Sequence, residues 1–298
     1  MKNVEGKVAF ITGGGSGVGL GMAKVFSRAG MKIVVADIRQ DHLDAATAAI
    51  ENREDLHTVK LDVTDRAAMA RAADETERVF GKVHVVCNNA GINMFAPMDE
   101  CTYDDWDWIM GVNLGGVING VQTFVPRIKK HGEGGHIVNT ASMASFISGP
   151  GAGIYTASKF AVRGISESLR WSLAPFKIGV SVLCPGLVKS TIYESDKIRP
   201  PQLSNAGPVN QEFMKRLPDV HLAGMEPEEV GEKVLRGIRR NDLYIFTHPE
   251  FKEELRALFD ETLAALPEGE APPARLEVEK GRRQIIANLK AHMLADIA

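Results

Sequence analysis

Cysteine is scarce in this sequence, and long apolar segments are missing. Among its 298 residues there are three cysteines, Cys87, Cys101 and Cys184. They are too few and too scattered for a disulfide framework or a zinc site, so we expect no metal and a reducing, cytoplasmic setting. No window approaches the ~18 consecutive apolar residues that a membrane span needs. These absences argue against a disulfide-stabilised secreted protein and against a membrane protein.

An excess of charge of one sign is also missing. The chain has 35 Lys and Arg against 38 Asp and Glu, a formal net charge of -3, and no basic run stands out. We therefore expect neither nucleic acid nor an anionic membrane surface as a partner. Residues 1–6 are polar, and the short apolar run at 7–12 leads directly into glycines, which argues against a secretory signal. A small molecule is the expected partner.

Short apolar segments alternate with longer amphipathic segments along the chain. The apolar segments are rich in Val and Ile, as strands buried on both faces are. They comprise 7–12, 31–37, 56–63, 83–88, 136–140, 178–184 and 243–247. Helical periodicity marks 19–29, 67–80 and 155–174 between them. This alternation predicts an α/β fold of the Rossmann type, with a doubly wound, mostly parallel sheet of about seven strands and helices on both faces.

The chain reads as one domain over residues 1–248, followed by a C-terminal helical extension at 249–298. Within the domain, the segment at about 187–225 is rich in Pro, Ser and Asn and is expected to form a mobile substrate lid. The extension contains two amphipathic segments on either side of a linker at 267–273. We expect it to pack on the same domain, with a subunit contact or an active-site cover as the alternative.

A glycine-rich loop, Thr12-Gly-Gly-Gly-Ser-Gly-Val-Gly19, follows the first predicted strand and precedes a helix. Glycines let the backbone turn tightly and let a pyrophosphate approach the helix N-terminus, where free N–H groups favour an anion. The spacing is Gly-x-x-x-Gly-x-Gly at Gly13, Gly17 and Gly19, not G-x-G-x-x-G. A second register that starts at Gly15 also fits, but Thr12 at the strand end favours the first.

The end of the second predicted strand indicates the type of cofactor. Asp37 lies about 20 residues past the glycines, where an acidic side chain binds the ribose hydroxyls of a dinucleotide. At ~4 Å and an effective dielectric of ~20, each pair of unit like charges costs about 4 kcal/mol. Even half of this disfavours the 2′-phosphate of NADP by more than about tenfold, so we predict NAD. Arg39 leaves NADP open, because it could meet a phosphate; otherwise it is a loop residue or covers the adenine.

Two tyrosines are each followed by a lysine four residues later, at Tyr155/Lys159 and at Tyr193/Lys197. On a helix this spacing puts both side chains on one face. A neighbouring ammonium and the positive nicotinamide of the oxidised cofactor lower a tyrosine pKa from ~10 toward the working range. Only Tyr155 follows a strand-like segment, which ends at Ser142, and ligands bind at the carboxyl ends of strands. We therefore place Tyr155 in the active site and Tyr193 in a loop, with substrate contact or plain surface loop as alternatives.

Several motifs, taken in order, resemble the short-chain dehydrogenase/reductase family over residues ~5–248. They are Thr12-Gly-x-x-x-Gly-x-Gly19, Asn88-Asn-Ala-Gly91, Asn113, Ser142, Tyr155-x-x-x-Lys159 and Pro185-Gly186. Each falls on the element that this family requires. The resemblance implies that Tyr155 is the general acid/base, that Lys159 lowers its pKa and binds the nicotinamide ribose, and that Ser142 positions the substrate oxygen. Asn113 would hold a water that links Lys159 to solvent; taken alone, it is a polar residue inside a predicted helix at 106–125.

The resemblance also implies which residues surround the cofactor. The glycine loop would contact the phosphates, Asp62 and Val63 the adenine, and the segment after Pro185 the nicotinamide, with Thr191 near its carboxamide. The expected cofactor-binding residues are Gly13, Ser16, Gly17, Val18, Gly19, Asp37, Arg39, Asp62, Val63, Asn89, Ala90, Gly91, Tyr155, Lys159, Pro185, Gly186, Val188 and Thr191. Taken alone, Asn88 and Asn89 would stabilise strand ends.

Large apolar side chains follow the predicted strand ends and are expected to line the substrate pocket. They are Met94, Phe95, Met143, Phe146, Leu187 and Tyr193. Such a lining suits an aromatic or otherwise bulky secondary alcohol or ketone. Segments 36–44, 102–108 and 193–195 are similar to bacterial Cα-dehydrogenases of lignin breakdown, which oxidise the benzylic alcohol of β-aryl ether dimers with NAD. This resemblance implies a substrate of that class.

Two other functions stay open from the sequence. A dehydrogenase for a steroid or another hydrophobic alcohol would share all of these motifs. A cofactor-binding regulator that has lost catalysis would not need the complete set of Asn113, Ser142, Tyr155 and Lys159, so the intact set favours an enzyme. By analogy with the family, we expect a homodimer or homotetramer.

Overall fold

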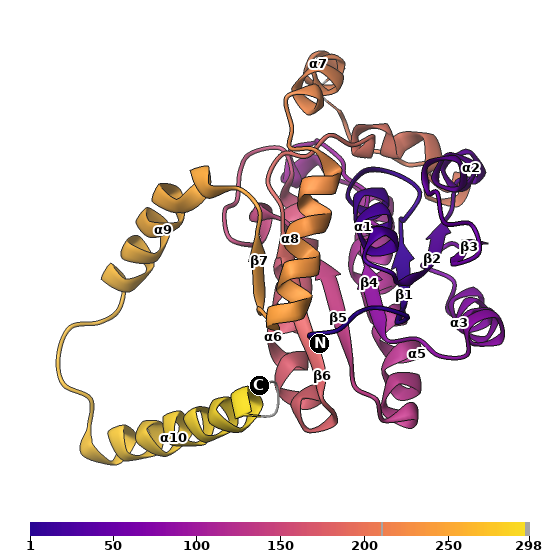
Figure 1. Ribbon diagram of the computed structural model, residues 1–298. Helices are drawn as coiled ribbons and strands as arrows, with labels where there is room; N and C mark the ends of the chain where they lie inside the picture. Colours follow the sequence, from indigo (N-terminus) through magenta and orange to yellow (C-terminus); the bar gives the residue numbers. More distant parts are fainter. Residues whose placement is uncertain (210, 296–298) are drawn as a thin grey trace.

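Seven parallel strands form one sheet within residues 1–209 and 211–295, the part of the chain that the computed structural model describes (Figure 1). They are β1 (Val8–Thr12), β2 (Lys32–Asp37), β3 (Leu56–Lys60), β4 (Val85–Asn88), β5 (Gly135–Thr140), β6 (Ile178–Cys184) and β7 (Tyr244–Phe246). Their order is β3-β2-β1-β4-β5-β6-β7, and every neighbouring pair is parallel. The predicted Rossmann-type, doubly wound fold is confirmed.

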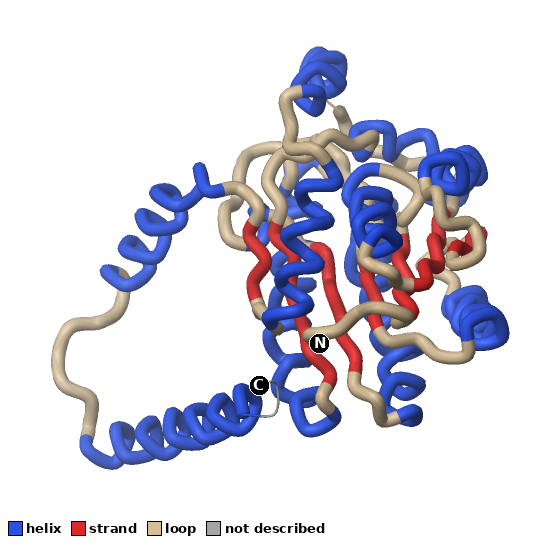
Figure 2. Tube along the Cα trace, in the orientation of Figure 1, coloured by secondary structure: helices blue, strands red, loops and turns tan. Residues whose placement is uncertain are grey.

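Helices cover both faces of this sheet, as Figure 2 shows with strands in red between helices in blue. The helices of the described residues are α1 (Gly17–Arg28), α2 (Gln40–Ala49), α3 (Arg66–Phe80), α4 (Tyr103–Met110), α5 (Gly116–His131), α6 (Gly153–Leu173), α7 (Gln211–Leu222), α8 (Pro227–Arg240), α9 (Lys252–Ala264) and α10 (Pro273–Ala295). Met22 of α1 and Val234 of α8 belong to the core of one face. Phe124 of α5 and Val162 of α6 belong to the core of the other.

Strand β1 shows why its sequence is apolar throughout. Neighbouring side chains of a strand point to opposite faces. Phe10 therefore packs in one core, where its ring lies 4.5 Å from that of Phe124, while Ala9 and Ile11 pack in the other. All three β1 side chains are fully buried. Burial of one such large side chain contributes about 1.5–3 kcal/mol, so the central strands are stabilised from both sides.

The third predicted strand, 56–63, is shorter than expected and ends at Lys60. Asp62 Oδ1 accepts hydrogen bonds from the backbone N–H and the hydroxyl of Thr64, at 2.9 and 2.8 Å. Asp65 accepts from backbone N–H groups in the first turn of α3 and caps that helix. These side chains stabilise a turn in place of a strand ladder, which ends the strand early.

The predicted helix over 106–125 is interrupted by a π-helical turn, η2 (Gly111–Gly115), between α4 and α5. Such turns are rare and concentrate at functional sites. Asn113 lies in this turn and is buried. Its Oδ1 accepts from the Ile92 N–H at 2.8 Å, and its Nδ2 donates to the Ile92 carbonyl at 3.0 Å. The turn thus directs the carboxamide to the loop after β4.

The first part of the C-terminal extension packs on the domain. Phe251, in the turn before α9, and Leu255 and Leu258 of α9 pack against the core that contains Phe124. Phe259 lies at an edge-to-face angle to Phe146, with ring centres 6.4 Å apart. The extension is therefore joined to the domain at the carboxyl ends of β6 and β7.

The second part of the extension differs from our prediction of packing on the same domain. The loop after α9 lies apart from the sheet, and α10 runs from it back toward the lower end of the domain (Figure 1). Leu276 and Ile285 of α10 are 45% and 62% exposed. Residues 296–298 of the extension lie outside the described residues. Among the described helices, none combines the length and apolar character of a membrane span.

Candidate active site

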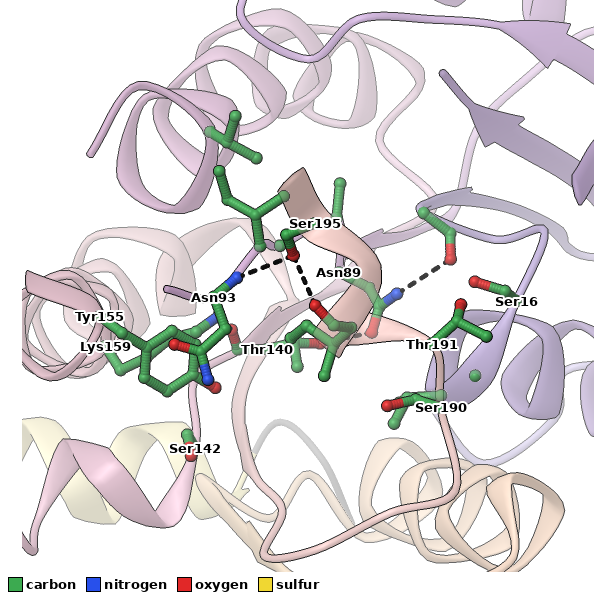
Figure 3. Close-up of a pocket in the computed structure, with 18 of the residues that line it drawn as sticks. Ser16, Asn89, Asn93, Thr140, Ser142, Tyr155, Lys159, Ser190, Thr191 and Ser195 are labelled. Atoms are coloured by element: carbon green, nitrogen blue, oxygen red, sulfur yellow. Dashed lines mark hydrogen bonds between the residues drawn. The ribbon is translucent and has the colours of Figure 1, made fainter. Parts of the chain in front are cut away.

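A cavity of about 680 Å³ lies at the carboxyl edge of the sheet (Figure 3). Its wall comes from the loops after β1, β2, β4, β5 and β6 and from the lid that follows β6. The strand order reverses between β1 and β4, and open α/β sheets bind ligands outside such a reversal. The volume lies within the usual range of ligand pockets.

The loop between β1 and α1 presents backbone to this cavity. Gly13 and Gly17 have φ of +59° and +48°, a left-handed conformation that glycine adopts without strain. A Cβ on Gly13 would also lie 2.8 Å from Ala90 Cα. Ser16, the N-cap of α1, makes no side-chain hydrogen bond to the helix. The N–H groups of this first turn are suited to an anion such as a pyrophosphate, so the loop fits the predicted cofactor.

Gly19 is the one predicted cofactor-binding residue outside the cavity wall as the structure describes it. A Cβ on Gly19 would lie 2.0 Å from the Gly13 carbonyl oxygen. Its role is therefore close packing of α1 on the loop, and the predicted contact is corrected. Gly21, the end of the alternative register, packs in the same way, because a Cβ there would lie 2.1 Å from the Pro227 carbonyl oxygen.

Hydrogen bonds join the carboxyl ends of β1, β4 and β5 below the cavity. The Thr12 hydroxyl accepts from the N–H groups of Asn89 and Ala90, at 2.9 and 3.0 Å. Asn89 Nδ2 donates to the Thr12 carbonyl, and the Thr140 hydroxyl donates to Asn89 Oδ1 at 3.1 Å. Figure 3 shows Asn89 and Thr140 close together at the cavity floor. Asn89 thus both lines the cavity, as predicted, and stabilises the strand ends.

Asp37, at the end of β2, lies in the cavity wall and is buried. Its carboxylate accepts hydrogen bonds from the N–H groups of Gly15 (3.1 Å) and Arg39 (3.0 Å). The Arg39 guanidinium binds two other carboxylates, those of Asp41 and Glu194. The hydrogen bond that it donates to Asp41 raises the pKa of Arg39 further above its already high usual value. Arg39 is the one arginine that we predicted beside the cofactor, and its charge is thus already neutralised by two carboxylates of the chain.

Tyr155 and Lys159 lie one helical turn apart at the start of α6, and both line the cavity. Lys159 is 3% exposed, and its ammonium donates to the Thr140 carbonyl at 3.0 Å. Burial lowers the pKa of Lys159 to about 8. Lys159 Nζ lies 5.4 Å from the centre of the Tyr155 ring. The helix therefore places a phenol and an ammonium side by side in the cavity wall.

The Tyr155 phenol has a shifted pKa in the chain alone. Burial raises the pKa above its usual value, and the nearby Ser142 side chain opposes that rise. Desolvation of the phenolate thus outweighs the neighbouring groups of the protein. Ser142 itself is fixed at the start of a short 3₁₀ turn, where its Oγ accepts from the Ala144 N–H at 3.1 Å. The expected decrease, by the ammonium together with a positive nicotinamide, stays a prediction for the chain with cofactor.

Asn113 lies behind this group, outside the cavity wall. Its Nδ2 donates to the Ser158 hydroxyl at 3.0 Å as well as to the loop after β4. A Cβ on Gly91 would lie 3.3 Å from Lys159 Nζ and 3.4 Å from Asn113 Oδ1, so both atoms flank the same glycine. Asn113 and Lys159 are thus brought to one place, although no direct hydrogen bond joins them among the described residues.

The other predicted cofactor-binding residues all lie in the cavity wall. They are Gly13, Ser16, Gly17, Val18, Asp37, Arg39, Asp62, Val63, Asn89, Ala90, Gly91, Tyr155, Lys159, Pro185, Gly186, Val188 and Thr191. They come from the loops after β1, β2, β3, β4 and β6 and from the start of α6, which are remote in sequence and adjacent at one sheet edge. Their placement agrees with the predicted groove.

The predicted substrate residues divide into two groups. Phe95, Met143 and Leu187 line the cavity. Phe146 does not: its ring lies among Tyr244, Phe246 and Phe259 and below the Arg163 guanidinium, 3.8 Å away. It is a core residue because the short turn after Ser142 carries it past the strand end.

Met94 and Tyr193 also lie outside the wall as described. Met94 is buried with Trp108 in a small core below the lid. The Tyr193 ring packs on that of His221, with centres 5.3 Å apart. His221, not Tyr193, reaches the cavity. These two side chains and that of Phe146 thus lie outside the cavity wall in this structure.

Sequence reasoning missed several residues of the wall. They include Asn93, Asp107, Trp108 and Phe251, whereas Ser195, Gln202, Leu203 and His221 of the wall lie within the predicted lid. The Ser195 hydroxyl accepts from the Asn93 N–H at 3.1 Å and joins the lid to the loop after β4 (Figure 3). Asn93 follows the Asn-Asn-Ala-Gly motif closely, which was a usable signal. Phe251 belongs to the amphipathic segment for which an active-site cover was the alternative to packing on the domain.

Comparison with known proteins gives consistent matches. Residues 7–199 match the short chain dehydrogenase family. The C alpha-dehydrogenase of Sphingobium sp. strain SYK-6 is 45% identical over 284 residues, 94% of this chain and 93% of that protein. A solved short-chain dehydrogenase from Novosphingobium aromaticivorans is 44% identical, with a TM-score of 0.83 over 97% of this chain and 99% of that one. A short-chain dehydrogenase/reductase from Burkholderia phymatum, solved in complex with NAD, is 34% identical, with a TM-score of 0.82 over 91% of this chain and 100% of that one.

Proposed function

The chain belongs to the short-chain dehydrogenase family, and we propose that it uses NAD to interconvert a secondary alcohol and a ketone. The observation that carries the proposal is the meeting of Ser142, Tyr155 and Lys159 at one cavity beside a glycine loop suited to a pyrophosphate. A regulator without catalysis would not need this arrangement. An oxidoreductase of this family needs the proton-transfer residues and the glycine loop at one cavity.

The preference for NAD over NADP is proposed from the end of β2. A 2′-phosphate carries about -1.5 to -2 charges. It would meet the Asp37 carboxylate, while Arg39 is paired with Asp41 and Glu194 and offers no free positive charge. The NAD in the Burkholderia phymatum relative supports the same choice. We expect wild type to favour NAD in kcat/KM by more than about tenfold, and Asp37→Ala to reduce that ratio by about tenfold. A wild-type preference for NADP would contradict this reading of Asp37.

Proton transfer is assigned to the residues of α6 and the turn after β5. When bound, NAD supplies the acceptor for the carbinol hydride. In alcohol oxidation, Tyr155 as phenolate takes the hydroxyl proton; in ketone reduction it returns the proton. Ser142, which lies close enough to the Tyr155 phenol to oppose the rise in its pKa, holds the substrate oxygen beside the phenol. The Lys159 ammonium stabilises the phenolate.

Asn113 is proposed to supply the path for that proton to solvent. Its Oδ1 accepts one hydrogen bond, from Ile92, and retains a second lone pair for a water. Gly91 lies between this oxygen and the Lys159 ammonium, and any side chain there would fill the space. A water in this space would connect Lys159 with the loop after β4.

The substrate is proposed to be the benzylic Cα alcohol of a β-aryl ether dimer. The apolar wall around the tyrosine, with Phe95, Met143 and Trp108, suits an aromatic ring. The similarity to the Sphingobium C alpha-dehydrogenase over nearly all of both chains supports the same substrate class.

The test is formation of reduced nicotinamide, followed by absorbance, with NAD and an aryl-glycerol-β-aryl ether. We expect turnover in wild type and none above background in Tyr155→Phe. A panel with a hydroxysteroid and a simple aryl alkyl carbinol tests the alternative of another bulky alcohol. Turnover of the steroid alone would contradict the proposed substrate and keep the proposed chemistry.

A homodimer or homotetramer is proposed from the apolar side chains that one chain leaves uncovered. Leu263, Leu276 and Ile285 of α9 and α10 are 63%, 45% and 62% exposed. A second copy would cover such side chains. Light scattering coupled to size-exclusion chromatography gives the mass directly; a monomer at micromolar concentration would contradict the proposal.

The three cysteines are all unpaired, which supports the expected cytoplasmic location.

A further inference from the structure

The loop that follows β6 is held in the cavity wall by other parts of the chain. The Pro185 carbonyl accepts from the Met143 N–H at 2.9 Å. The Leu187 carbonyl accepts from the Met225 N–H at 2.9 Å, and the Lys189 N–H donates to the Met225 carbonyl at 3.0 Å. The conformation of this loop therefore depends on its neighbours, and they decide what it presents to a bound molecule.

His248, just after β7, binds the same loop at two backbone atoms. The Gly186 N–H donates to His248 Nδ1 at 3.0 Å, and Nε2 lies 2.9 Å from the Leu187 carbonyl oxygen. The Thr247 hydroxyl lies 2.6 Å from Nδ1. A backbone N–H only donates, so Nδ1 must accept. The proton is then on Nε2, which donates to Leu187, and the ring is neutral in one tautomer.

Packing around Gly186 reinforces these hydrogen bonds. A Cβ on Gly186 would lie 2.6 Å from Phe251 Cε2 and 2.9 Å from His248 Cγ. The two rings meet nearly edge to face, with centres 6.2 Å apart. His248 is 8% exposed. The segment after β7 thus fixes both the hydrogen bonds and the close packing of Gly186.

We propose that His248 is a positioning residue for the nicotinamide end of the cofactor site. Its neutral imidazole holds Gly186 and Leu187 in the conformation that they present to the cavity. It acts through this backbone and touches neither cofactor nor substrate. The inference rests on the proposed function, since the loop has this role only if a nicotinamide cofactor binds. It makes the start of the C-terminal segment part of the active site.

The first test is on cofactor-free protein labelled with 15N-histidine. We expect the His248 ring signals, identified by their loss in His248→Gln, to show a protonated Nε2 and an unprotonated Nδ1 at neutral pH. A protonated Nδ1 at pH 7, in the other tautomer or in a charged ring, would overturn the proposal. The result does not depend on the enzyme's substrate.

The second test is the affinity for NADH, measured by fluorescence titration. In His248→Ala we expect the Kd to rise about tenfold, because both hydrogen bonds to the backbone of the loop are lost. His248→Gln retains one acceptor and one donor, so its Kd should stay within about threefold of wild type. His57→Ala is the matched control, since His57 pairs with Glu75 on the edge strand β3 and its Kd should not change.

The outcomes separate this inference from the proposed function. An unchanged Kd in His248→Ala, or an equal loss in His248→Gln and His248→Ala, would overturn the positioning role alone. A wild type that binds neither NADH nor NADPH would overturn the proposed function, and the positioning role with it. If His248→Ala does not fold, the tautomer and the His248→Gln titration still decide the matter.

Discussion

The same Tyr-x-x-x-Lys spacing occurs in α6 and in the lid, and the two places differ in almost every other respect. In α6, Lys159 is 3% exposed and its ammonium donates to the Thr140 carbonyl, and the nearby Ser142 opposes the rise in the Tyr155 pKa. In the lid, the Lys197 side chain is 64% exposed and pairs with Glu194 at 2.8 Å. Spacing brings a phenol and an ammonium together, but burial and neighbours decide whether they do chemistry.

The difference has a physical cause in the dielectric environment. A buried ammonium interacts strongly with a nearby phenolate, whereas an exposed one is screened by water and by its own carboxylate partner. The lid tyrosine, Tyr193, packs on His221 and has no hydroxyl-bearing partner comparable to Ser142 among its described contacts. The strand end that precedes α6 provides this partner, and the lid segment has no such strand.

The largest effect should come from exchanging each tyrosine for phenylalanine. Tyr155→Phe removes the group that takes the proton, so kcat should fall by about 10²–10⁴-fold. Tyr193→Phe keeps the ring on His221, and its kcat should stay within about threefold of wild type. Steady-state rates with saturating NAD make the measurement. Equal losses in the two variants would break the distinction between the two motifs.

Lys159→Met should have the next largest effect, with opposite signs on activity and stability. Without the ammonium, the pKa of Tyr155 should rise. The rate of alcohol oxidation increases with pH as Tyr155 loses its proton, so this increase should occur at higher pH than in wild type. At a given pH, kcat should fall by about 10²-fold. Rate profiles between pH 6 and 10 test this. A profile that coincides with that of wild type would contradict the assigned role of Lys159.

The stability of wild type should itself depend on pH through Lys159. Its pKa is about 8 in the folded chain, below the unfolded value of ~10.4. The unfolded state then binds more protons between these values, so stability should increase as pH rises from about 8 to 10. Below pH 8, Lys159→Met avoids the burial of a charge and should be more stable than wild type by about 1–3 kcal/mol. Denaturant unfolding at pH 7 and 9.5 tests both statements.

Ser142→Ala should have an effect of intermediate size, and it tests the difference between the α6 site and the lid. It removes the hydroxyl that is proposed to hold the substrate oxygen beside Tyr155, so kcat/KM should fall by about 10–10²-fold. The Ala144 N–H loses its acceptor too, at a cost of about 1 kcal/mol in stability. Ser195→Ala in the lid is the matched control and should reduce kcat/KM less than Ser142→Ala. A larger loss in the lid variant would reverse the comparison.

The smallest effect is expected from Lys197→Met. The side chain is exposed and its ion pair with Glu194 is a surface interaction, worth about 0–1 kcal/mol. We expect kcat, KM and the melting temperature to remain within error of wild type. A loss above about tenfold in kcat would show that the lid motif takes part in the reaction.

Much of the fold and site could be predicted, and the reasons are local. Apolar segments such as that of β1 are long enough to identify a strand buried on both sides, and the glycine loop, Ser142 and Tyr155 each lie after the end of such a strand. Parallel strands bring their carboxyl ends to one edge, so these residues had to meet. The predictions that were wrong concern side chains one or two turns further along the chain. Phe146 is an example: one short 3₁₀ turn directs it into the core.

The sequence by itself determined the doubly wound sheet, the glycine loop, the carboxylate at Asp37 and the pairing of Tyr155 with Lys159. Each of these depends on residues close together in sequence or on the period of a strand or helix. Only the tertiary structure decided which Tyr-x-x-x-Lys pair is buried, that apolar side chains of α10 stay exposed, and that His248 binds Gly186. Burial, exposure and hydrogen bonds between remote segments depend on how whole elements pack, and no local pattern encodes them.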